Sequence, residues 1–81
     1  MDRSIFRLSE IPVGKKCKVL KLISKGKERN RMLDLGIVKG IEIEVLQQSP
    51  SGNPIAYFVK GAVIALRLED SDKIIVLSTN K

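Results

Sequence analysis

Histidine and tryptophan are absent from this chain of 81 residues, and it contains a single cysteine, Cys17. Without histidine, the chain lacks the usual general base, the partner of serine and cysteine nucleophiles, and the commonest ligand of transition metals. A single cysteine excludes an internal disulfide. Cys17 falls in an expected strand facing inward, where a free cysteine behaves as a small hydrophobic residue rather than a nucleophile. We therefore expect no enzymatic activity, no catalytic residue and no cofactor.

Long hydrophobic runs are also missing. No segment approaches the roughly 20 apolar residues that span a bilayer, and the residues after Met1 lack the run of about 7–15 apolar residues of a secretory signal. No glycine-rich phosphate loop is present, since Lys25-Gly26-Lys27 is too short to surround a phosphate. We expect a single domain over residues 1–81, located in the cytoplasm.

Carboxylates are the remaining candidates for chemistry. Glu69, Asp70 and Asp72 lie within four residues and could hold a hard divalent cation weakly through oxygen. A selective ferrous site would combine carboxylates with histidine or cysteine, and no such cluster is present. We therefore expect no functional metal site and interpret this segment as an acidic turn.

The net charge of +6 is concentrated in one segment. Residues 15–31 contain only one acid, Glu28, against eight basic side chains: Lys15, Lys16, Lys18, Lys21, Lys25, Lys27, Arg29 and Arg31. A basic region on a nearly neutral body favours an acidic partner, a phosphate or a membrane surface. The same lysines also suit the solvated surface of a basic protein, so both interpretations stay open.

Alternation of apolar and polar residues predicts five strands, at Cys17–Ile23, Ile41–Gln48, Ile55–Lys60, Val63–Leu68 and Ile74–Leu77. The alternation slips at Lys21, which predicts a bulge or a sharp bend. A helix of about two turns is expected over Lys27–Leu35, and one helical turn over residues 69–73. These elements predict a mainly β fold, a small and strongly bent antiparallel barrel with one short α-helix after its first strand.

The segment from Met32 to Gly40 carries the most specific structural signal. Gly36 follows the expected helix where a left-handed residue ends it, which places Ile37 and Met32 at the two positions whose apolar contact closes such an ending. Gly40 suits the third position of a turn over residues 38–41, where a positive φ is needed. Gly61 is expected in the hairpin between the third and fourth strands.

This order of elements resembles the FeoA family, the small cytosolic accessory proteins of bacterial ferrous iron uptake. The resemblance covers about Leu8 to Val76, through Pro12-Val13-Gly14, Met32 to Gly36, Gly40 before an alternating strand, Asn53-Pro54, and Gly61 through Ala65-Leu66-Arg67. The family often has proline before the turn glycine, where this chain has Lys39, and lysine can adopt the same conformation. The resemblance implies an SH3-like barrel.

The resemblance further implies a regulatory protein that binds the cytoplasmic part of FeoB, the membrane transporter for ferrous iron, without carrying iron itself. Any proximity to the membrane would come through the transporter. Two docking surfaces stay open, the basic segment 15–31 and the exposed part of the expected helix with the turn at residues 36–40. We expect partner contacts from Lys25, Lys27, Arg29, Arg31, Met32 and Leu35.

Two other classes of function stay open. Small β-barrels with a basic face bind nucleic acid through aromatic side chains beside the charges. The three aromatic residues, Phe6, Tyr57 and Phe58, all lie outside the basic segment, so no specific nucleic acid is expected. The chain also resembles the SH3-like domain that ends some iron-dependent repressors, and a stand-alone relative of that domain would bind a peptide or a neighbouring domain.

Overall fold

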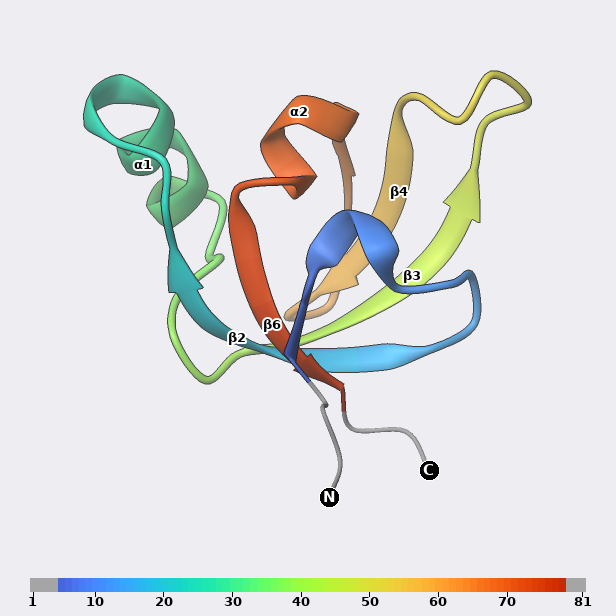
Figure 1. Cartoon of the computed structure of the whole chain (residues 1–81), viewed down its shortest axis with the longest axis horizontal. Helices are drawn as coiled ribbons and strands as arrows, with labels where there is room; N and C mark the ends of the chain where they lie inside the picture. The colour runs from blue at the N-terminus through green and yellow to red at the C-terminus, as the bar shows by residue number, and fades with distance from the viewer. Residues whose placement is uncertain (1–4, 79–81) are drawn as a thin grey trace.

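Six antiparallel strands form one sheet in the computed structural model, which describes residues 5–78. In sheet order they are β1 (Ile5–Arg7), β6 (Ile74–Ser78), β2 (Lys16–Leu22), β3 (Glu42–Gln48), β4 (Ile55–Val59) and β5 (Ala62–Leu66). A 3-10 helix, η1 (Leu8–Glu10), and two α-helices, α1 (Gly26–Asp34) and α2 (Leu68–Ser71), lie in the connections. In Figure 1 the long strands β2 and β3 curve around the interior, and both α-helices lie at the upper end of the view. The predicted mainly β barrel is confirmed. Its short helix, α1, follows β2, which was the first predicted strand, because β1 was not predicted.

Two β-bulges bend this sheet. The register between β2 and β6 shifts between Val19 and Lys21, and the register between β3 and β4 shifts between Val45 and Gln47. An extra residue on one strand bends that strand and increases its twist. The first bulge is the bend that the slip at Lys21 predicts. The second was not predicted, because two polar glutamines follow Leu46 and give no alternation against which a slip could be seen.

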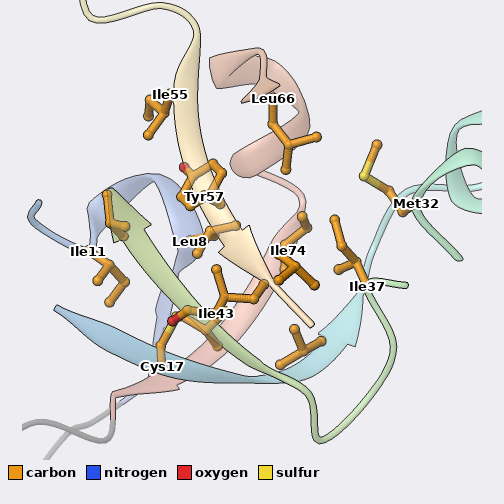
Figure 2. Close-up of a cluster of buried hydrophobic side chains, with 14 residues drawn as sticks. Leu8, Ile11, Cys17, Met32, Ile37, Ile43, Ile55, Tyr57, Leu66 and Ile74 are labelled. Carbon is orange, nitrogen blue, oxygen red and sulfur yellow. The ribbon is translucent and has the colours of Figure 1, made fainter. Parts of the chain in front are cut away.

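Buried side chains from β2 to β6, from η1 and from α1 meet inside the barrel (Figure 2). Cys17 is fully buried, as predicted, and its thiol lies 3.7 Å from the carbonyl oxygen of Ile43. Tyr57 is fully buried, whereas the side chain of Phe58 is 41% exposed, because neighbouring residues of a strand point to opposite faces. The core consists of Leu8, Ile11, Cys17, Val19, Met32, Ile37, Ile43, Val45, Ile55, Tyr57, Val59, Leu66, Ile74 and Val76.

A polar contact inside the core ties α2 to the sheet. The Tyr57 hydroxyl lies 2.9 Å from the Ser71 hydroxyl, which also donates to the Arg67 carbonyl oxygen at 3.4 Å. Burial raises the pKa of Tyr57 to about 12, so the phenol stays neutral and able to donate. The contact satisfies two hydroxyls that would otherwise be buried at a cost.

The end of α1 has the geometry that the sequence predicts. Gly36 has a φ of +90°, and its N–H donates to the Leu33 carbonyl at 2.9 Å. The Ile37 N–H donates to the Met32 carbonyl at 3.0 Å, which completes the Schellman pair of hydrogen bonds. Ile37 and Met32 are both buried. Gly40, also at +90°, lies in the following turn, which the Ile41 N–H closes onto Val38 at 3.1 Å.

The structure corrects three details of the predicted sheet. It has six strands rather than five, since β1 pairs with β6 although all three of its residues are exposed and show no buried face. The turn between β4 and β5 is Lys60-Gly61, with φ values of 51° and 82°, so β5 begins at Ala62 rather than at Val63. Arg67 and Leu68 leave the sheet to begin α2, because the Asn53 side chain accepts the Leu68 N–H at 3.0 Å.

Candidate docking site

Two sides of α1 have different roles. On one side, Arg31 forms an ion pair with Asp70 of α2 at 2.7 Å, and Glu28 forms one with Lys73 at 3.4 Å. These contacts join the helix to α2 and to the start of β6. On the other side, Arg29 and Leu33 lie one turn apart and share a face, as residues i and i+4 of a helix do. This second side is turned toward β2, where Arg29 donates to the Leu22 carbonyl at 3.4 Å.

A hollow of about 300 Å³ lies between this side of α1 and β2, with Leu20, Lys21, Leu22, Arg29, Leu33 and Lys39 around it. Its three leucines are only partly covered, and Leu33 is 37% exposed. Its three cations are exposed. An apolar floor with a basic rim suits an acidic protein segment that carries apolar side chains.

The structure separates the six residues from which we expect partner contacts. Arg29 lines the hollow, and Lys25 and Lys27 are exposed at the start of α1. Arg31 is exposed but paired with Asp70. Met32 is 2% exposed and lies in the core (Figure 2), so its side chain offers no surface to a partner.

Leu35 is half-buried and packs against the core. The helix therefore turns Met32 and Leu35 inward and presents Leu33 to the hollow.

Sequence reasoning included Leu33 and Lys39 only as parts of the expected helix and of the turn at residues 36–40, and it did not place Leu20 at a surface. The signal for Leu33 was its place in the helix. It lies about 100° around the helix axis from Met32, so the two side chains point in different directions and Leu33 is not buried with Met32. Lys39 carried no such signal, because only the tight turns at Gly36 and Gly40 bring it back beside β2. The Gly40 N–H donates to the Val19 carbonyl at 2.8 Å, which holds that turn against the strand.

The exposed aromatic Phe58 lies at a different hollow, of about 280 Å³, which Lys16, Lys60, Glu42 and Glu44 also line. Glu42 and Glu44 stand opposite Lys18 and Lys16 in the pairing of β2 with β3. Two carboxylates beside the aromatic ring repel the phosphates of a nucleic acid. With two lysines and two carboxylates around the ring, this hollow has no net positive charge to attract a single strand.

The three acids of the 69–72 segment have partners of their own. Asp70 pairs with Arg31, Asp72 accepts a hydrogen bond from the Ser9 hydroxyl, and Glu69 lies 3.9 Å from Arg67. Across residues 5–78, no group of three or more cysteine, aspartate or glutamate side chains is placed to hold a metal ion. Nor does that part of the chain contain a helix long and apolar enough to cross a membrane.

Fold and surface together define a small β-barrel module of the SH3-like class, with a basic, partly apolar hollow at its helix. Residues 6–77 match the model of the FeoA domain, so the chain belongs to the FeoA family. The resemblance seen in the sequence is confirmed.

Relatives with known structures agree with this assignment. The chain superimposes with a TM-score of 0.89 on a FeoA-like protein from Clostridium acetobutylicum, at 30% identity and covering 99% of this chain and 93% of that one. The zinc complex of FeoA from Stenotrophomonas maltophilia, described as an SH3 domain protein, is 27% identical, with a TM-score of 0.76 and coverage of 85% and 86%. A manganese-dependent transcriptional repressor matches over 91% of this chain and 41% of its own, with a TM-score of 0.83 but only 17% identity, which shows a shared fold alone.

A curated relative contains the same domain in a much longer chain. The Fe(2+) transport protein A/Fe(2+) transporter FeoB fusion protein of Porphyromonas gingivalis is 36% identical over 68 residues, which are 84% of this chain. The chain spans only 8% of that relative's length.

Proposed function

We propose that this protein is a non-enzymatic accessory protein of ferrous iron uptake that acts in the cytoplasm by binding the cytoplasmic part of a FeoB-type transporter. The observation that carries the proposal is the fusion relative, in which an Fe(2+) transport protein A and an Fe(2+) transporter FeoB are one polypeptide. Two domains in one chain are held at a high effective concentration, and fusion is useful where the domains act together. Membership of the FeoA family supports the same role.

The surface that we assign to docking is the hollow between α1 and β2. Lys21, Arg29 and Lys39 give it a positive rim, and the three leucines give it an apolar floor. Charged rims accelerate association and select the partner, while apolar side chains at the centre supply most of the affinity. The bound segment of the transporter is therefore expected to be acidic with at least one large apolar residue.

The test compares two triple variants that remove the same charge. In the first, Lys21, Arg29 and Lys39 of the hollow become Gln. In the second, the matched control, Lys15, Lys18 and Lys27 become Gln; these are exposed but do not line the hollow. Exposed substitutions usually change stability by no more than about 0.5 kcal/mol each, so both variants should fold.

We expect the hollow variant to bind the detergent-solubilised transporter about tenfold more weakly than wild type at low salt, and the control variant to bind within about twofold. The difference should shrink as salt rises, because screening weakens attraction between exposed charges. An equal loss of affinity in the two variants would show that binding to the transporter depends on the total charge and not on the hollow. Weaker binding of the control variant alone would place the docking surface at Lys15, Lys18 and Lys27.

A further inference from the structure

The first two turns of α1 are held less firmly than its last turn. Residues 25–31 are all exposed, and Met32 is the buried residue of the helix. Met32 lies in the core, and its carbonyl oxygen accepts the Ile37 N–H at 3.0 Å, so the end of the helix is anchored. In Figure 1 the helix lies at the upper left of the view, beyond the end of β2. A helix segment without buried apolar side chains has little local stability.

The start of α1 also lacks most of the features that stabilise a helix N-terminus. Gly26, its first residue, has a φ of 60°, and Lys25 before it makes no capping hydrogen bond with its side chain. The first N–H groups of any helix have no partner within the helix, and a lysine at the cap position offers them no acceptor. Lys25 and Lys27 also outnumber Glu28 at the positive end of the helix dipole. The first turns therefore gain little stability from the helix itself.

Two ion pairs connect these turns to the rest of the molecule. Arg31 pairs with Asp70 of α2 at 2.7 Å, and Glu28 pairs with Lys73, just before β6, at 3.4 Å. The side chains of Arg31, Glu28 and Lys73 are 48–59% exposed, so solvent and salt screen both pairs. An exposed ion pair shifts an equilibrium by roughly fivefold at most. Two such contacts do not tie the opening of these turns to the unfolding of the whole barrel.

The same turns form part of the wall of the hollow between α1 and β2. Arg29 lies at its rim and donates to the Leu22 carbonyl at 3.4 Å, a long hydrogen bond at an exposed site. When these turns open, this cation and its hydrogen bond leave β2, and Leu33, next to the anchored Met32, stays behind. The hollow therefore has its complete basic rim only while the turns are closed.

We infer that residues 25–31 form an arm that opens and closes while the barrel stays folded, and that closing the arm completes the docking hollow. Asp70 and Lys73, which do not line the hollow, are then positioning residues, because they set the fraction of molecules in which the arm is closed. The opening of the arm needs no partner, whereas its effect on docking rests on the proposed function, so separate measurements test the two parts.

The opening of the arm is measured by amide hydrogen exchange of the intact protein by NMR, at several urea concentrations below the unfolding transition. Asn30 and Arg31 report on the arm, because their N–H groups bond to its first turn. Val19 and Val45, whose N–H groups each donate at 3.0 Å to a neighbouring segment of the barrel, report on the sheet. We expect exchange at the arm to be at least about thirtyfold faster, after correction for intrinsic rates, and nearly independent of urea. Equal rates with equal urea dependence would show that α1 opens only when the whole barrel unfolds, which would overturn the inference.

Two double variants that lose the same charge test what holds the arm closed. R31Q/K73Q breaks both ion pairs, whereas K25Q/K27Q removes two lysines that form no ion pair within residues 5–78. At low salt we expect exchange at the arm to be about fivefold faster in R31Q/K73Q than in wild type, and no faster in K25Q/K27Q. High salt should bring R31Q/K73Q and wild type together, because screening weakens the ion pairs. Equal acceleration in both variants, or none in R31Q/K73Q, would overturn the positioning role of Asp70 and Lys73.

The effect on docking is measured with the detergent-solubilised transporter, by hydrogen exchange of this protein read by mass spectrometry of fragments that cover the arm. Saturating transporter should slow exchange of the arm at least about fivefold, because binding to the complete hollow favours the closed arm. A transporter that binds but leaves this exchange unchanged would overturn the link between the arm and docking. A transporter that does not bind at all would contradict the proposed function, while the opening measured without it would stand.

Discussion

Replacing Gly36 tests the link between the helix ending and stability, and the structure separates the two possible causes of damage. A Cβ atom built at Gly36 would meet only the flexible Lys60 side chain, at Cδ, 3.8 Å away, which is ordinary contact. Steric overlap is therefore not the cause of any loss on Gly36→Ala. The φ of +90° is the cause, because an L-residue in a left-handed conformation is strained by about 1–2 kcal/mol.

The expected magnitude follows from two opposing terms. Alanine also restricts the unfolded chain, which offsets about 0.4–1 kcal/mol of the strain, so Gly36→Ala should cost roughly 1 kcal/mol net. Gly36→Asn should cost less, because asparagine tolerates positive φ, and Gly36→Val should cost clearly more, because a β-branched residue is least tolerant. For a domain of this size, 1 kcal/mol corresponds to about 4–8 °C in Tm.

The assay is thermal and urea denaturation followed by circular dichroism, with Asn30→Ala as a control. Asn30 is an exposed position in the middle of α1, where alanine should change stability by no more than about 0.5 kcal/mol. We expect the alanine variant to lose more stability than the asparagine variant and less than the valine variant. A Gly36→Ala variant as stable as wild type, or an asparagine variant as unstable as the valine variant, would refute the assignment of the cost to φ.

Two further predictions concern the core and the contact between helices. Burial raises the pKa of the Cys17 thiol from about 9 to about 12, so between these values the folded protein keeps a proton that the unfolded chain loses. The free energy of unfolding should therefore be unaffected below about pH 9. It should fall as the pH rises toward 12, by at most about 1.4 kcal/mol per pH unit. Urea midpoints measured between pH 8 and 10.5 should show this fall in wild type. In Cys17→Ala the midpoint should begin to fall only near pH 10, where the tyrosine of the unfolded chain starts to lose its proton. A fall that begins at the same pH in both proteins would contradict the assignment to Cys17. Arg31→Ala should lower stability by about 0.5 kcal/mol at low salt and by less at high salt, because its ion pair with Asp70 is half exposed on the arginine side. Lys27→Ala is the control for lost charge on α1, and an equal loss there would show that the pair adds nothing.

Local features of the chain were readable from the sequence because each depends on neighbouring residues only. The left-handed glycine that follows α1 was predicted at Gly36, where the structure has it, since this glycine and its apolar partners lie within six positions of one another. The inward side of Cys17 and the opposed sides of Tyr57 and Phe58 follow from strict alternation along a strand. The bend in β2 was visible for the same reason, as a break in that alternation at Lys21.

Features that depend on distant residues were not readable. The strand β1 has no buried side chain, so only its pairing with β6 makes it a strand. The start of α2 at Leu68 depends on Asn53, fifteen residues earlier, whose side chain accepts its N–H. Arg31 looked like a free surface cation until the fold brought Asp70 beside it.

The candidate site shows the same division. The sequence determined that the chain lacks histidine and that its positive charge is concentrated in residues 15–31, since both follow from composition and order. The tertiary structure decided that two of these cations, Lys21 and Arg29, border an apolar hollow, and it added Lys39, which reaches β2 only through two tight turns. Leu33 faces outward because Met32 fills the core. Likewise, the apolar run Ala62–Leu66 becomes an edge strand only through the order of strands in the sheet. Side-chain packing and strand order act over the whole chain, so a surface becomes defined only when the barrel is complete.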